Sequence, residues 1–305
     1  MTLLDWCRVF RIQTLGATAM APVFGAALVI GFDFRLLYVF FFGVLVHLVG
    51  FGHNNFCDRK ADPNDHSNPI ARGIISEQAA ALVLGILWGV MYLFPIFFVE
   101  TDIVVVFIIV LTMSVSGTLY NMLSKRFVLS GAFLGLWICT LTLSGFAFFS
   151  LDWNLAIGIL CLAAFMQCWC QWIEGLVKDR LTDFVNLARR LRGRKWEVFF
   201  WGSAVVQIIV LDLVIWEIQP EAVYRRMSFL FITMSAVVWL GISSQPNRSM
   251  MLKLSGLHEI LIYEAVVCCL SVFVGEWVIL FGVVPVLIYF GFNKLLYGEM
   301  GRPRI

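Results

Sequence analysis

The sequence predicts an all-α membrane protein: a single domain over residues 1–305 in which nine or ten transmembrane helices form a bundle around a central cavity. The first observation is composition, because 61% of the residues are hydrophobic and only 14% are charged, with a mean hydropathy of +0.89. Soluble globular chains are about 45–50% apolar. The second observation is pattern, since apolar runs long enough to cross a bilayer alternate with short polar segments. Together they predict a polytopic helical bundle.

Eight apolar runs in the first four fifths of the chain are each predicted to form one transmembrane helix. In chain order they cover residues 15–32, 36–56, 79–99, 103–122, 128–149, 155–177, 198–215 and 228–242. A last apolar stretch, 257–296, is interrupted by Gly275 and Glu276. As one helix it would extend about 60 Å, about twice the thickness of the hydrocarbon layer, so two spans fit it better. The apolar pattern alone therefore gives ten spans.

The basic residues gather in every second loop between these runs. Lysine and arginine mark the cytoplasmic side of membrane proteins, so we expect both termini in the cytoplasm. The protein is therefore expected to be a multi-pass integral protein, in the cell membrane and surrounded by lipid. Its net charge of +2 is too small to indicate a nucleic-acid partner.

A polar stretch, 53–62, follows the second run and carries Asn54, Asp58 and Asp62. Their four-residue spacing places the three side chains on one face of a helix, one turn apart. Carboxylate and amide oxygens aligned in this way suit a hard cation, which can in turn hold a phosphate. The alternative is a solvated loop that anchors the helix end.

A second stretch, after the sixth run, carries Glu174, Lys178, Asp179 and Asp183, again with two aspartates four residues apart. An even number of predicted spans separates the two stretches, so both should lie on the cytoplasmic side of the membrane. We therefore expect them to face each other across a cavity and to bind a diphosphate through Mg²⁺.

Such a site also needs basic side chains, because four aspartates and a diphosphate carry more negative charge than two Mg²⁺ ions neutralise. The alternative for each basic residue is a purely anchoring role at the cytoplasmic surface. The candidates are Arg11, Arg72, Lys125, Arg126 and Lys178.

Polar residues within the sixth run are the candidates for lining the cavity. Gln167 and Gln171 are four residues apart, and Glu174 falls on nearly the same helical face. Hydrogen bonding between helices, without a role in function, explains these residues equally well.

The two stretches and the segments between them resemble motifs of the UbiA superfamily of intramembrane prenyltransferases. Residues 54–62 follow the first aspartate-rich motif, N-D-x-x-D-x-x-x-D, with one change. Residues 68–76 follow R-P-(L/I)-x-x-G-x-(I/V)-S, and 120–126 match Y-x-x-x-x-K-R. Residues 179–183 match the second motif, D-x-x-x-D, and the resemblance covers roughly residues 8–295.

The resemblance implies a bundle of about nine helices and an enzyme that transfers an isoprenyl group from a prenyl diphosphate to a small aromatic or lipid acceptor. It implies Mg²⁺ as the cofactor, bound by Asn54, Asp58, Asp62, Asp179 and Asp183. It gives catalytic roles to Arg72, Tyr120, Lys125, Arg126 and Lys178. From the charge argument and the polar face of the sixth run, we expect substrate binding by Arg11, Asn54, Gln167, Gln171 and Glu174.

Three positions depart from the motifs. Asn55 stands where the family usually has Asp, Asn68 where Arg is usual, and Thr182 where another Asp is frequent. None of the three is among the implied metal ligands, so the diphosphate chemistry is retained.

Three other functions remain open at the level of sequence. A UbiA-type terpene cyclase would use the same cavity and quench the cation within its own chain. Another enzyme of the same superfamily would transfer phosphoribose to a polyprenyl phosphate. From another class, a transporter would use the charged loops to gate an ion path, with broken helices and an internal repeat as its usual signs.

Overall fold

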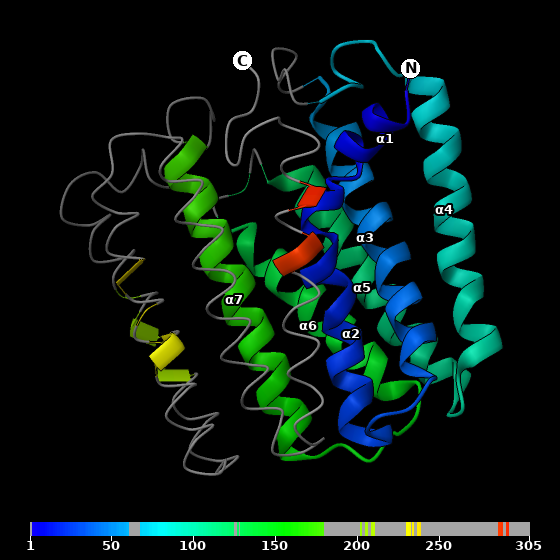
Figure 1. Ribbon diagram of the computed structural model, residues 1–305, viewed down its shortest axis with the longest axis vertical. Coiled ribbons are helices and arrows are strands. Elements are labelled where there is room, and N and C mark those ends of the chain that lie inside the picture. The colour runs from blue at the N-terminus through cyan, green and yellow to red at the C-terminus, as the bar shows by residue number, and fades with distance from the viewer. Residues whose placement is uncertain are drawn as a thin grey trace.

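The computed structural model describes residues 2–60, 68–124, 127 and 129–179, with scattered positions between 202 and 292. Within these ranges every regular element is helical (Figure 1), which confirms the predicted all-α class. The elements are α1 (Leu3–Val9), the 3₁₀ helix η1 (Ile12–Thr14), α2 (Leu15–Ile30), α3 (Leu36–Asp58), α4 (Glu77–Phe98), α5 (Ile103–Leu123), α6 (Gly131–Ala147) and α7 (Leu155–Asp179).

Helices α2 to α7 coincide with the first six predicted spans, and most of their ends lie within two residues of the predicted ones. Four apolar helices are long enough to cross a membrane, namely Ile12–Ile30, α3, α4 and α5, and shorter apolar helices occur in α6 and α7. The chain is therefore an integral membrane helical bundle. The predicted seventh to tenth spans fall almost wholly outside the described residues, so their number stays a prediction.

The helices form a bundle in which α6 is central and α4 is peripheral (Figure 1). Helix α6 packs against α2, α5 and α7, whereas α4 packs mainly against α3. The outer face of α4 exposes large apolar side chains, among them Leu82, Ile86 and Leu93. Because no hydrophobic effect rewards burying such residues inside a bilayer, this face is suited to contact lipid.

Helices α2 and α6 approach each other almost backbone to backbone. A Cβ atom added to Gly145 would lie 1.8 Å from the carbonyl oxygen of Pro22, and one added to Gly25 would lie 2.1 Å from that of Thr142. Small residues at such crossings allow the close van der Waals packing that stabilises membrane helix pairs. Glycine is therefore required at both positions.

Aromatic side chains fill one end of the bundle. Phe42 and Phe148 are fully buried, with ring centroids 5.1 Å apart, and Phe94 packs on Phe42 at 5.9 Å. Within the described helices, these rings fill the end of the bundle where α3 begins.

A short helix, α1, covers the other end of the bundle, and the apolar pattern did not predict it. Helix α1 begins with a capping box, in which Thr2 and Asp5 each bond the other's backbone amide. The turn that follows packs Val9 and Phe10 against Ile70 and Ile75 of the loop before α4. Helices α3 and α7 both end on this side of the bundle (Figure 1). The helices that lead into the two acidic stretches thus point the same way.

Candidate active site

Asn54 and Asp58 lie on consecutive turns at the C-terminal end of α3, and both are half-buried. The Asn54 side chain is oriented by a chain of amides. Asn121 on α5 donates from Nδ2 to the Gly50 carbonyl at 3.1 Å, so its Oδ1 is left to accept from Asn54 Nδ2 at 3.2 Å. A carbonyl can only accept, so this order of donors is fixed. Asn54 consequently presents its oxygen, not its nitrogen, to a ligand.

These two residues fit the metal that the resemblance implies. An amide oxygen and a carboxylate are hard ligands, and Mg²⁺ in proteins is usually held by one or two carboxylates together with substrate phosphate. Within the described ranges no three His, Cys, Asp or Glu side chains form a ready-made metal cage.

Four of the predicted metal-binding and catalytic residues lie outside the described part of the chain: Asp62, Lys125, Arg126 and Asp183. The backbone of α7 carries Gln171, Glu174, Lys178 and Asp179, but their side chains lie outside it as well. Asp179 is the last residue of α7 and Asp58 the last of α3. Whether the four aspartates share cations stays a prediction.

Arg11 is the basic candidate that the structure places beside α3. Its backbone has a φ of 46°, in the left-handed region that residues other than glycine rarely adopt. Its guanidinium lies over the Phe51 ring, 5.6 Å from the centroid, and makes a long contact of 3.5 Å from Nη2 to Asn55 Oδ1. Arg11 thus reaches the same end of α3 as Asp58.

Arg72 lies in a tight turn at this end of the bundle, and its side chain is exposed. Gly73 has a φ of 69°, which closes the turn, and Gly73 N–H donates to the Ile70 carbonyl at 3.0 Å. Ile70 and Ile75 on either side are buried and hold the turn in place. Among the described residues no carboxylate pairs with Arg72, so this exposed side chain is accessible to a ligand.

Arg59, in contrast, is already neutralised. It pairs with Glu77 at 2.8 Å, donates to the Phe56 carbonyl and lies over the Phe56 ring. This ion pair joins the end of α3 to the start of α4, as expected of an anchoring residue.

The two Asn departures from the motifs contact each other. Asn68 is buried and donates from Nδ2 to the backbone carbonyl of Asn55 at 2.8 Å, while its Oδ1 accepts from the Ile70 N–H at 3.0 Å. Asn55, also buried, donates from Nδ2 to the Val9 carbonyl at 2.6 Å. The two side chains therefore tie α1, the end of α3 and the Arg72 turn into one unit.

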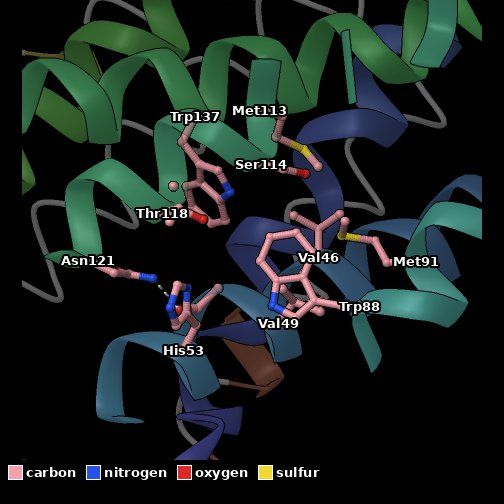
Figure 2. A pocket seen from close by; sticks show the side chains of 12 residues that line it. Val46, Val49, His53, Trp88, Met91, Met113, Ser114, Thr118, Asn121 and Trp137 are labelled. Carbon is pink, nitrogen blue, oxygen red and sulfur yellow. Dashed lines mark hydrogen bonds between the residues drawn. The ribbon is translucent and has the colours of Figure 1, made fainter. Parts of the chain in front are cut away.

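A narrow pocket begins at Asn121 and extends between α3, α4, α5 and α6 (Figure 2). Its free volume is only about 10 Å³, room for about one water molecule, so the lining side chains almost fill it. Trp88 and Trp137 line it, and Met91, Met113 and Val46 add apolar side chains. Asn121 thus lines this pocket and also bonds the side chain of Asn54.

Trp137 sets the width of this pocket. Its indole lies between two glycines, because a Cβ atom at Gly50 would lie 3.1 Å from it and one at Gly117 would lie 2.8 Å from it. The ring thus fills the space where α3, α5 and α6 meet.

A wider surface hollow of about 270 Å³ lies at the opposite end of the bundle, around Arg35. Both Glu100 oxygens accept from Arg35 Nη1 at 2.8 Å, and Asp33 accepts from Nη2 at 2.9 Å. Two carboxylates neutralise this guanidinium, so the hollow is poorly suited to a diphosphate.

The remaining described candidates lie on neighbouring helices. Tyr120 is half-buried on α5, one residue before Asn121, and Gln167 is half-buried on α7. Trp172 is buried on α7 with its ring packed on Gly131. The structure thus places Tyr120 next to the pocket-lining Asn121, whereas Gln167 is absent from the pocket lining.

Two residues near the site were missed from the sequence, Asn121 and Trp137. His47, which is recognisable as a polar residue within an apolar run, is fully buried and contacts the Phe10 carbonyl. A polar side chain inside an apolar run was the available signal for Asn121 and His47. Trp137 carried none, since tryptophans in a membrane bundle are mostly packing residues.

No protein-family model matches the sequence, and no curated protein matches it. Solved structures do match the fold. A UbiA homologue from Aeropyrum pernix K1 aligns with a TM-score of 0.68 at 12% identity, over 84% of this chain and 98% of that one. A digeranylgeranylglyceryl phosphate synthase aligns at 0.65 and 17% identity, over 88% and 98%.

A third structure is a UbiA homologue from Archaeoglobus fulgidus bound to GPP and Mg²⁺, with a TM-score of 0.61 and 15% identity, over 86% of this chain and 99% of that one. The TM-scores establish a common fold, and each alignment covers nearly the whole of the matched chain. At identities this low, the similarity extends to the fold alone. The predicted UbiA resemblance is confirmed at the level of architecture: this chain is a membrane helical bundle with the fold of the UbiA homologues.

Proposed function

We propose that the protein is a Mg²⁺-dependent intramembrane prenyltransferase, which moves an isoprenyl group from a prenyl diphosphate to a small aromatic or lipid acceptor. The observation that carries the proposal is that two environments adjoin at Asn121. Asn54 and Asp58 present oxygen ligands at the end of α3, and Asn121 bonds Asn54 while also lining the aromatic pocket. A prenyl diphosphate has the same two parts, an anionic head and an apolar tail.

The fold comparison supports the same substrate class. UbiA homologues from A. fulgidus were solved with GPP and Mg²⁺ and with DMAPP and Mg²⁺. We propose the corresponding ligand set here, with Mg²⁺ held by Asn54, Asp58, Asp62, Asp179 and Asp183. We also propose that these residues face the cytoplasm, in the cell membrane.

The reaction breaks the bond between C1 of the isoprenyl group and the bridging oxygen, and the diphosphate leaves with the bonding electrons. The acceptor's nucleophilic atom then bonds to C1 and releases a proton. When bound, Mg²⁺ would neutralise part of the negative charge on the departing diphosphate. Arg11 and Arg72, with Lys125, Arg126 and Lys178, stabilise the same charge from the protein side.

The pocket side chains serve the other half of the reaction. Trp88, Trp137 and the neighbouring methionines form an apolar wall beside the polar residues His53, Ser114 and Thr118, and this wall limits the access of water to the allylic cation. A desolvated aromatic face stabilises a nearby cation by up to about 2 kcal/mol. Tyr120, which precedes Asn121 in α5, is a further ring that we propose for this role.

The test uses the purified full-length protein in lipid nanodiscs, with Mg²⁺ and geranyl diphosphate, with and without a lipid extract. We expect a prenylated product by mass spectrometry when the extract is present, and none after chelation of Mg²⁺. Asp58→Asn should abolish product while the protein still unfolds at the wild-type temperature. Asp152→Asn, in the loop before α7, is the control and should keep full activity.

Two outcomes contradict the transferase assignment. A cyclised hydrocarbon or alcohol formed without any acceptor would identify a terpene cyclase. No consumption of geranyl, farnesyl or geranylgeranyl diphosphate by folded protein would remove prenyl diphosphates as the substrate class.

A further inference from the structure

Three residues on one face of α3 hold the turn that carries Arg11. His47, Phe51 and Asn55 are four residues apart, so they lie on successive turns of the same face. His47 Nε2 lies 2.9 Å from the Phe10 carbonyl and 3.3 Å from that of Arg11. Carbonyl oxygens only accept, so this nitrogen carries the proton and donates.

Asn55 completes the set by donating to the Val9 carbonyl at 2.6 Å. The carbonyls of Val9, Phe10 and Arg11 therefore all accept from α3. These groups follow the end of α1, where backbone carbonyls have no partner within the helix. The contacts explain how Arg11 is kept in its left-handed conformation, which is unfavourable for a residue with a side chain.

The Arg11 guanidinium is held between neutral groups, the Phe51 ring and the Asn55 side-chain oxygen. Among the described residues, none places a carboxylate within ion-pair distance of it. The nearest acidic residue along the chain, Asp5, pairs with Arg8 at 3.3 Å. The hydrogen bond from the Thr2 backbone lowers the pKa of Asp5, so this pair stays ionised. Arg11 thus keeps its positive charge available for an anion.

Asn55 cannot be exchanged for Asp without changing this arrangement. A carboxylate oxygen in place of Nδ2 would face the Val9 carbonyl, acceptor against acceptor, at 2.6 Å. The other oxygen, 3.5 Å from Arg11 Nη2, would form an ion pair with the guanidinium. An Asp here would therefore both loosen the turn and neutralise Arg11.

We propose that His47 and Asn55 are positioning residues, which hold the Val9–Arg11 turn so that Arg11 presents an uncompensated charge to the diphosphate of the substrate. This rests on the proposed function. Asn55 adjoins Asn54 and lies within one turn of Asp58, so Arg11 approaches the predicted cation site from the side of α1.

The experiment measures binding of inorganic diphosphate with Mg²⁺ to full-length protein in nanodiscs, by titration calorimetry, beside kcat and KM for geranyl diphosphate. Arg11→Met and Asn55→Asp should each weaken diphosphate binding about tenfold or more, with a matching rise in KM. The double variant should bind no more weakly than Arg11→Met alone, because Asn55 acts through Arg11. Arg8→Met removes an arginine from the same segment and should leave binding unchanged.

His47 provides an independent arm if Asn55→Asp lowers stability. His47→Gln keeps a donor for the Phe10 carbonyl and should retain near-wild-type affinity, whereas His47→Leu should weaken binding as Arg11→Met does. The proposal is overturned if folded Asn55→Asp and His47→Leu bind diphosphate normally. It is also overturned if the double variant loses affinity by the product of the two factors measured for Asn55→Asp and Arg11→Met alone. In that case Asp58→Asn would still abolish binding. Failure of the proposed function looks different, since wild-type protein would then bind neither diphosphate nor geranyl diphosphate.

Discussion

Asn54 on α3 donates a hydrogen bond of 3.2 Å to the side-chain oxygen of Asn121 on α5. The bond joins the first acidic stretch to the segment that resembles Y-x-x-x-x-K-R. It also makes Asn121 the residue that decides which atom Asn54 offers to a ligand, because the other end of the Asn121 amide is committed to the Gly50 carbonyl.

Asn121→Ala should therefore raise the Mg²⁺ concentration needed for half-maximal turnover of geranyl diphosphate by about tenfold, since Asn54 is then free to turn its nitrogen toward the cation. Ser116→Ala on the same helix is the matched control, because the Ser116 hydroxyl bonds only the Thr112 carbonyl of its own helix among the described residues. An unchanged Mg²⁺ dependence in folded Asn121→Ala would show that Asn54 needs no such support.

Trp137→Leu should widen the apolar pocket and shift donor preference toward longer chains. The ratio of kcat/KM for geranylgeranyl over geranyl diphosphate is expected to rise about tenfold, the lower end of what one added group in an apolar pocket is worth. Trp153→Leu, in the exposed loop before α7, serves as the control. A ratio unchanged by Trp137→Leu would mean that the isoprenoid tail lies elsewhere.

Gly145→Ala should destabilise the bundle by about 1–3 kcal/mol or more, because its Cβ would overlap the Pro22 carbonyl and force α2 and α6 apart. Thermal unfolding in detergent measures the loss. Gly89→Ala on α4 is the comparison, since an added Cβ there meets no atom within 4 Å. Equal unfolding temperatures for the two variants would contradict the close crossing.

The ion pairs at the far end of the bundle predict a small pH effect. Hydrogen bonding to Arg35 lowers the pKa of Asp33 below its ordinary value. A carboxyl group with a lowered folded-state pKa adds stability above its unfolded pKa of about 3.9 and loses it as the pH falls through the folded value. Wild type should therefore unfold at a higher temperature than Asp33→Asn near about pH 6, and the difference should vanish toward about pH 3.

Salt provides the check on this interpretation, because both side chains are partly exposed. High salt screens exposed charges, so the difference near neutral pH should shrink as salt is added. A difference that persists at acid pH would indicate that Asp33→Asn acts through packing instead.

The amino-acid sequence alone was enough to predict the membrane bundle and the limits of its first six spans. An apolar run of about 20 residues can satisfy its backbone in lipid only as a helix, so composition and length carry this information locally. The four-residue spacing of Asn54 and Asp58 was equally local, since a single helix is enough to place them on adjacent turns. The UbiA-like architecture, in contrast, was expected from the resemblance of four sequence motifs to a known family.

Tertiary structure alone decided which side chains meet. The amide chain from Gly50 through Asn121 to Asn54, the indole of Trp137 between two glycines, and the support of Arg11 by His47 and Asn55 each join helices far apart in the sequence. In these contacts the orientation of a donor or the width of a pocket depends on how helices cross, which no periodicity encodes. The sequence therefore determined the secondary structure and the kinds of side chains at the membrane surface. The packing of the helices against one another determined how those side chains are oriented.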